Sequence, residues 1–261
     1  MFTFKKWRRR RLMSEPWPSE WLGIVERNVP YYRLLVPQQQ RELHGLIRIF
    51  LAEKPFEGCG GLELDDEIRV TIAAQGCILI LGRDTGIYPK LRSVLVYPQA
   101  YVANVTARQP DGTVVEGRQG RLGESWMQGY VVLSWEDVLL AASGVHDGRN
   151  VVFHEFAHQL DNESGAPEGV PLLSAGSMYA AWSRVFGAEY RALCDSVERD
   201  EPTLLDAYGA ISPAEFFAVA TEFFFERPVE LKARHPELYE QLKLFYRHDP
   251  AVLTRGASND E

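Results

Sequence analysis

Cysteine is scarce in this sequence. Its 261 residues include only 3 cysteines, Cys59, Cys77 and Cys194, which are widely spaced and form no CxxC pair. A disulfide-stabilised scaffold needs an even set of paired cysteines. The pattern therefore excludes a disulfide framework and favours free thiols in a reducing compartment.

Long apolar runs and an excess of positive charge are also missing. No window approaches the roughly 18 uninterrupted apolar residues of a membrane-spanning helix. Lysine and arginine total 28 against 36 aspartates and glutamates, and the formal net charge of −8 argues against nucleic acid as the main partner. Together with the cysteines, these absences predict a soluble, cytoplasmic protein that contacts neither nucleic acid nor a membrane.

A signal peptide is not expected either. Residues 5–11 read KKWRRRR, but the sequence that follows, LMSEPWPSEW, is broken by Pro16 and Pro18 where a signal peptide would be apolar. We expect residues 1–19 to form a basic, flexible tail. A contact between this basic run and phosphate or acidic lipid is the alternative interpretation.

The rest of the composition is typical of one globular domain. Hydrophobic residues make up 46% of the chain and charged residues 25%, and no internal repeat or low-complexity linker is present. We predict a single domain over residues 20–250. Residues 251–261 are expected to form a polar tail that is disordered or, alternatively, folds over the active-site cleft.

The hydrophobic pattern predicts a mostly helical α+β protein with a small central sheet. Helices are predicted over 37–53, 65–81, 150–162, 177–198, 212–226 and 235–247. Strands are predicted over 94–97 and 130–135, and a turn with a hairpin over 110–122. For residues 65–81, two strands are the second interpretation, because Val70, Thr71 and Ile72 are β-branched.

The segment VVFHEFAHQLD, residues 151–161, contains an HExxH motif. His154 and His158 are four residues apart, so on a helix both imidazoles project from one face and can reach one zinc ion at ~2.0–2.1 Å. Glu155 lies one position round the helix, where it can contact a water bound to the metal. The flanking positions are apolar, whereas a surface helix with two incidental histidines would have polar residues there. The pattern predicts a buried, zinc-binding helix.

A catalytic zinc also needs a third protein ligand and an open position for water. The metzincin spacing would require a ligand at Ser164 and a glycine at Asp161, so that arrangement fails. The later segment SPAEFFAVATEFFFE offers Glu215 and Glu222, seven residues apart on one face of an otherwise apolar helix. A buried carboxylate must be paired, protonated or bound to metal. Since Glu215 could instead complete a capping box, residue chemistry alone leaves both glutamates open.

Several segments resemble the Mlc titration factor A family of bacterial zinc metallopeptidases. They are FEGCGG (56–61), VLVYP (94–98), HEFAHQLD (154–161), GVP (169–171), DAYGAISPAEFFAVATEFFF (206–225) and FYRHDP (245–250). Together they span roughly residues 20–250, and HEFAHQLD with PAEFFAV is the most specific combination. The resemblance implies a gluzincin-like metallopeptidase fold, similar to the catalytic domain of anthrax lethal factor.

The resemblance also implies the roles of individual residues. The family holds its zinc by the two histidines of HEFAH and the glutamate of PAE, which here are His154, His158 and Glu215. Glu155 corresponds to the catalytic glutamate. In the catalytic domain of anthrax lethal factor a tyrosine seven residues before the glutamate ligand faces the zinc; Tyr208 has the corresponding position here, and the resemblance implies that it is a second catalytic residue.

Two further acidic residues are candidates for orienting a ligand histidine. Glu222 could accept the second ring N–H of such a histidine, and Asp161, two helical turns after His154, is its rival for this role. Ordinary helix-terminal or surface positions remain the alternative for both.

The expected activity is zinc-dependent hydrolysis of peptide bonds, with Glu155 as the general base for a zinc-activated water. The partners would be a peptide or protein substrate and, as the family resemblance implies, an Mlc-like sugar-responsive repressor. The strand at 130–135 is the candidate edge for pairing with the substrate, and an interior strand is the alternative. Endopeptidase and aminopeptidase modes both stay open. Two other functions stay open as well: a regulatory binding protein that keeps the zinc site without catalysis, and a structural zinc protein.

Overall fold

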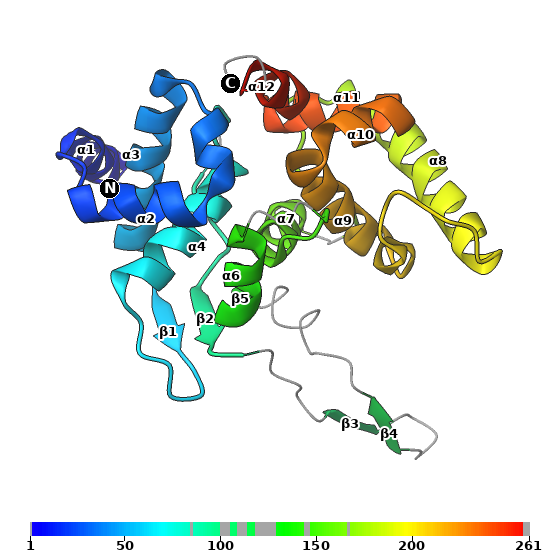
Figure 1. Cartoon of the computed structure of the whole chain (residues 1–261), viewed down its shortest axis with the longest axis horizontal. Helices are drawn as coiled ribbons and strands as arrows, with labels where there is room; N and C mark the ends of the chain where they lie inside the picture. Colours follow the sequence, from blue (N-terminus) through cyan, green and yellow to red (C-terminus); the bar gives the residue numbers. More distant parts are fainter. Residues whose placement is uncertain are drawn as a thin grey trace.

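The structure is a computed structural model that describes residues 2–83, 86–99, 105–108, 114–117, 129–143, 147–165 and 168–257. Helices dominate, with a small sheet among them (Figure 1). The helices are α1 (Phe2–Ser14), α2 (Ser19–Asn28), η1 (Pro30–Leu34), α3 (Pro37–Glu53), α4 (Asp66–Ile78), α6 (Trp135–Ala142), α7 (Val151–Asn162), α8 (Met178–Glu198), η2 (Ala207–Ala210), α9 (Pro213–Glu226), α10 (Pro228–Arg234), α11 (Pro236–Tyr246) and α12 (Pro250–Ala257). The strands are β1 (Phe56–Gly58), β2 (Ser93–Tyr97), β3 (Val105–Arg108), β4 (Val114–Gly117) and β5 (Tyr130–Ser134). This arrangement is compatible with the predicted α+β class.

The predicted helices correspond to α3, α4, α7, α8, α9 and α11. The last four begin one residue later than predicted, because the first residue of each predicted range is the N-cap. At α7 and α9 the caps are Asn150 and Ser212, whose side chains accept hydrogen bonds from backbone N–H groups of the first turn. Residues 65–81 are helical as far as Ile78, with Asp65 as the N-cap, so the two-strand interpretation is wrong.

The sheet has three parallel strands in the order β1-β2-β5. Strands β2 and β5 are the two predicted ones, whereas β1 is only three residues long and carries no alternating pattern that could predict it. Within the described part of the chain β5 is therefore an edge strand. A hydrogen bond of 3.4 Å from the Gln159 side chain of α7 to the Tyr130 carbonyl of β5 joins this edge to the helix that carries HExxH.

A second, antiparallel pair lies between β2 and β5 in the chain. Strand β3 pairs with β4, from Val105 opposite Gly117 to Arg108 opposite Val114. The predicted hairpin over 110–122 overlaps this pair only at β4, and its remaining residues lie outside those that the structure describes.

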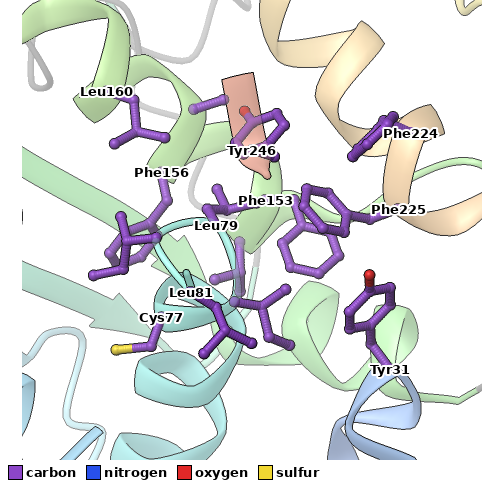
Figure 2. Close-up of a cluster of buried hydrophobic side chains, with 14 of the residues drawn as sticks. Tyr31, Cys77, Leu79, Leu81, Phe153, Phe156, Leu160, Phe224, Phe225 and Tyr246 are labelled. Atoms are coloured by element: carbon purple, nitrogen blue, oxygen red, sulfur yellow. The ribbon is translucent and has the colours of Figure 1, made fainter. Parts of the chain in front are cut away.

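The core is aromatic and surrounds α7. Figure 2 shows side chains of α4, α7 and α9 meeting in one cluster, with Phe153 between the C-terminal end of α4 and the α9 residue Phe225. The rings of Phe153 and Phe225 lie 5.1 Å apart, and those of Phe156 and Tyr88 lie 4.9 Å apart, centre to centre. Burial of such rings stabilises the fold by roughly 1.5–3 kcal/mol per side chain. The apolar residues of the HExxH segment therefore fix α7 in the interior.

The two ends of the described chain are helical where tails were expected. Helix α1 occupies most of residues 1–19 and packs on α3, where the Arg9 guanidinium donates two hydrogen bonds of 2.6 and 2.7 Å to Glu53. Helix α12 contacts η1 and α10 rather than the cleft described below. The basic composition of the first segment and the polar end of the second obscured the contacts that order them. Among the described residues, no helix combines the length and the apolar character needed to span a membrane.

Gly76 is required where α4 crosses α7. A Cβ atom at this position would lie 2.8 Å from the Phe156 ring, which is fully buried. We expect Gly76→Ala to lower the free energy of unfolding by about 1–3 kcal/mol, because overpacking outweighs the gain in helix propensity. Urea denaturation followed by circular dichroism measures this difference.

Gly187→Ala is the matched control, since its Cβ would meet only the end of the Arg191 side chain, at 3.5 Å in helix α8. This variant should be neutral or slightly more stable. Equal stability of the two variants would show that the α4–α7 contact does not demand a glycine.

Candidate metal centre

Three potential ligand atoms converge from α7 and α9. His154 Nε2 lies 3.2 Å from His158 Nε2 and 3.0 Å from Glu215 Oε2, and His158 Nε2 lies 3.3 Å from the same oxygen. Ligands of a tetrahedral zinc with bonds of ~2.0–2.1 Å are themselves about 3.3 Å apart. The three side chains are mostly buried. Their geometry and donor types therefore fit one metal ion.

The first turn of α7 is fixed by Asn150. Its side-chain oxygen accepts a hydrogen bond of 3.0 Å from the Phe153 backbone, and its side-chain nitrogen donates one of 2.9 Å to Glu226 of α9. Its backbone N–H donates to Glu222 Oε2 at 2.6 Å. One residue therefore ends the loop before α7 and ties the start of this helix to the C-terminal half of α9.

Glu222 orients the first histidine. Its second oxygen, Oε1, lies 2.7 Å from His154 Nδ1, so the ring N–H donates to this carboxylate and Nε2 points toward Glu215 and His158. Burial alone would lower the pKa of His154, but its contacts with Glu215 and Glu222 raise it well above the usual range. The sequence left Glu222 open between a ligand and an orienting residue, and the geometry gives it the orienting contact.

Glu215 does not use its carboxylate as a helix cap. The Ser212 hydroxyl accepts a hydrogen bond of 3.2 Å from the Glu215 backbone N–H, while the carboxylate points toward the two histidines. Burial would raise its pKa, but the hydrogen bonds from His154 and His158 lower it to about 2. Glu215 is therefore a carboxylate held ionised next to the imidazole nitrogens.

Glu155 is the adjacent buried acid. Only 2% of its surface is exposed, and its Oε2 atom has no hydrogen-bond partner among the described residues. Burial, together with the neighbouring carboxylates Glu215 and Glu222, raises its pKa to about 7 against the opposing effect of His154. A buried carboxylate with a free oxygen and a pKa near neutrality has the properties of a proton acceptor.

Tyr208 lies next to the first histidine and belongs to η2, the short helix before α9. The ring centres of Tyr208 and His154 are 5.9 Å apart. Asp206 holds the turn that carries this tyrosine, because one of its oxygens accepts the Tyr208 backbone N–H at 2.9 Å and the other accepts Arg149 at 2.7 Å. Burial and the nearby carboxylates raise the pKa of Tyr208, so its hydroxyl stays protonated.

A cleft of about 520 Å³ lies beside the converging ligand atoms. It is lined by His154, Glu155 and Tyr208 together with acidic and apolar side chains of α6 and of the loop before α7. The predicted catalytic pair thus shares one solvent-accessible space with a predicted ligand. This volume is in the range of small-molecule and peptide sites.

Asp161 has a different position from the one considered in the sequence. Its Oδ2 accepts a hydrogen bond of 2.7 Å from the Gly169 backbone N–H. Gly169, at φ 73°, packs closely on Pro213, the first residue of α9. A Cβ atom added to Gly169 would lie 2.3 Å from the Pro213 carbonyl oxygen. Asp161 therefore anchors the loop that supports the start of α9. The sequence did not predict these contacts of Asp161 and Gly169, although the GVP motif that contains Gly169 was a signal for them. It also did not predict the hydrogen bonds of Asn150 with α9.

Comparison with known proteins identifies the family of this chain. The profile of the family described as Glucose-regulated metallo-peptidase M90 matches residues 4–247. The chain is 43% identical over 249 residues to an uncharacterized protein of Synechocystis sp., slr2042, with 94% of this chain and 90% of that protein covered. It is 31% identical to Mlc titration factor A of Salmonella agona, covering 93% of this chain and 90% of the relative, and 33% identical to that of Klebsiella pneumoniae, covering 87% and 86%.

The family whose profile matches most of the chain is a family of metallopeptidases. The chain belongs to the glucose-regulated metallo-peptidase M90 family, in agreement with the resemblance seen in its sequence.

Replacing Glu222 by glutamine should weaken metal binding without removing a ligand. The amide cannot accept from both His154 Nδ1 and the Asn150 backbone, so the imidazole loses its fixed orientation. We expect zinc affinity to fall 10- to 100-fold, measured by competition with a chromophoric chelator. Glu226→Gln, which changes another carboxylate of α9 and keeps an oxygen to accept from the Asn150 side chain, should leave the affinity within about threefold. An unchanged affinity in Glu222→Gln would refute the orienting role.

Asp161 should make stability depend on pH. Burial raises its pKa from 3.8 to about 6, partly offset by backbone hydrogen bonds from Gly169 and Val170. Because the folded state then binds the proton more tightly than the unfolded state, the free energy of unfolding falls as pH rises from about 4 to about 6, by about 3 kcal/mol. The difference in unfolding free energy between wild type and Asp161→Asn should fall by that amount over this range, measured by urea denaturation.

Asp249→Asn provides a control of opposite sign. Although burial acts to raise the pKa of Asp249, hydrogen bonds from Tyr239 and Lys243 hold it below the usual value. The difference in unfolding free energy between wild type and Asp249→Asn should therefore rise with pH. The same slope for both variants would contradict the assignment for Asp161.

Proposed function

We propose that this protein is a zinc-dependent peptidase. The observation that carries the proposal is the triangle of His154 Nε2, His158 Nε2 and Glu215 Oε2, with edges of 3.0 to 3.3 Å, beside a cleft that also contains Glu155. Membership of a metallopeptidase family supports it. Two imidazoles and one carboxylate are also a donor set of catalytic zinc sites, which keep one position open.

The residues around the triangle have separate tasks in this proposal. When bound, zinc supplies a Lewis acid that polarises a carbonyl and lowers the pKa of a coordinated water towards about 7. Glu155 accepts a proton from the attacking water and delivers it to the amine that leaves when the C–N bond breaks. The protonated Tyr208 hydroxyl donates a hydrogen bond to the oxygen on which negative charge develops.

The substrate we propose is an extended peptide or a protein segment. Strand β5, an edge of the described sheet, offers backbone groups for pairing and is joined to α7 by the Gln159 side chain. The three free cysteines favour a reducing, cytoplasmic setting for this activity. Whether cleavage is internal or at an amino terminus depends on substrate subsites, and the proposal covers both modes.

A regulatory role through partner binding is the second candidate. It is favoured by the relatives named Mlc titration factor A, which suggest an Mlc-like, sugar-responsive repressor as the protein partner. Such binding would use an exposed surface and would survive loss of zinc, whereas peptide hydrolysis would not. The protein could then keep the metal site without turnover.

Digestion of a mixed peptide library, followed by mass spectrometry, tests the peptidase. Zinc-loaded wild type should cut, and Glu155→Gln should lose at least about 10³-fold in rate while still binding zinc, because it keeps the triangle and lacks the proton acceptor. His158→Ala should lose zinc as well as activity. Activity retained in Glu155→Gln would overturn the proposed mechanism.

Tyr208→Phe separates the hydroxyl from the ring. We expect kcat to fall about 10²-fold or more with zinc affinity unchanged, as for removal of one oxyanion donor. No cleavage by any form, with zinc bound to the wild type, would instead favour the regulatory candidate. Binding of an Mlc-like repressor to both wild type and His158→Ala would then support that alternative.

A further inference from the structure

Helix α1 concentrates the positive charge of this protein. Its sequence, FTFKKWRRRRLMS, contains two lysines, four arginines and no acidic residue. The whole chain has a formal net charge of −8, so the chain outside α1 carries −14. A single surface helix therefore has a charge opposite in sign to that of the rest of the molecule.

One face of α1 is bound to α3. Arg9 forms its paired hydrogen bonds with Glu53, Lys5 lies 3.4 Å from the same carboxylate, and the Met13 side chain covers Gly45. This attachment fixes which side of the helix faces outward. It also gives α1 a structure before it meets any partner, so binding does not have to include the cost of folding the helix.

The opposite face carries two exposed aromatic rings among basic side chains. Phe4 is 71% exposed and Trp7 57% exposed, and their rings stack with centres 6.1 Å apart. Lys6 and Arg10 flank them, are exposed, and form no ion pair with any described residue. Large aromatic residues placed together in solvent have an unfavourable hydration free energy and mark a contact surface.

We propose that this face of α1 binds the surface of an anionic lipid bilayer. Trp and Phe are the side chains that enter the boundary between headgroups and acyl chains, and lysine and arginine next to them contact anionic headgroups. The helix would lie in the plane of the interface, which differs from spanning the membrane. The proposal therefore replaces the expectation that this protein has no membrane partner by a peripheral contact.

A bilayer fits the charge distribution better than a nucleic acid does. The positive charge lies on one helix at the edge of the molecule, and a flat surface can contact this helix while the acidic remainder stays in solvent. A single-stranded nucleic acid binds along a positively charged groove that follows its backbone, whereas α3, next to α1, has two arginines and two glutamates and adds no net positive charge. The two stacked rings, which face outward beside each other, also suit insertion to one common depth.

The location of α1 leaves the cleft accessible. Figure 1 places α1 beside α3 at one end of the molecule, with α7 in the middle and α8 at the other end. A bilayer bound to the outer face of α1 would therefore leave the opening near His154 and Tyr208 exposed to a substrate. The inference does not depend on the proposed peptidase activity.

Sedimentation with lipid vesicles tests the proposal on the full-length protein. Wild type should bind vesicles of phosphatidylcholine with 25% phosphatidylglycerol at least tenfold more strongly than pure phosphatidylcholine, and 0.5 M NaCl should abolish the difference. The double variant Lys6→Glu, Arg10→Glu should bind the anionic vesicles at least about 20-fold more weakly, since each lost charge lowers partitioning about fivefold. Phe4→Ser with Trp7→Ser should lower binding about tenfold at unchanged charge.

The matched control has the same charge change at the other end of the molecule. Arg191→Glu with Arg234→Glu, on α8 and α10, should reduce binding less than threefold. Circular dichroism confirms that each variant is folded. The proposal is overturned if the α1 variants bind like the control, if neutral and anionic vesicles bind equally, or if the wild type binds a 20-nucleotide single-stranded DNA while ignoring vesicles.

Discussion

The contact between His154 and Glu222 determines how the two central helices meet. Glu222 accepts from the imidazole with one oxygen and from the Asn150 backbone with the other. Glu215, two turns earlier on the same helix, reaches the opposite nitrogen of the same ring. Helix α9 therefore runs alongside one imidazole and contacts it at both ends. A rotation of either helix would break both contacts, so the aromatic packing of α7 and α9 has to be compatible with this one orientation.

This arrangement collects negative charge in the interior. Glu155, Glu215 and Glu222 lie around two histidines, and such a group is costly to bury unless a cation is close. The structure meets this constraint locally by directing the carboxylates of Glu215 and Glu222 at imidazole nitrogens. It is also why one group of side chains can contain both an ionised carboxylate and one whose pKa lies near neutrality. Glu215 receives two histidine contacts, whereas the Oε2 of Glu155 receives none from the described residues.

The elements with strong periodicity were predictable from the sequence, and so were the two histidines, whose spacing needs only a helix. The choice between Glu215 and Glu222 did not follow from residue chemistry and rested on the family resemblance, because both lie on one face and differ only by about 10 Å along the helix axis. Which one meets Nε2 depends on how α9 passes α7, and this is a property of tertiary packing. Strand β1 is too short to show a pattern. Helix α1 was missed because its order comes from contacts with α3 rather than from an apolar stripe.

The three ligand residues of the triangle are not synthesised at the same time. Its two histidines belong to one helix, but its carboxylate follows 57 residues after His158 in the chain. At a synthesis rate of about 5–20 residues per second, this interval takes about 3–11 s. During that time a nascent chain has the histidine pair but neither the glutamate that completes the triangle nor the one that orients His154. The site is therefore assembled late, and an incomplete chain cannot present the full set of ligands to a metal.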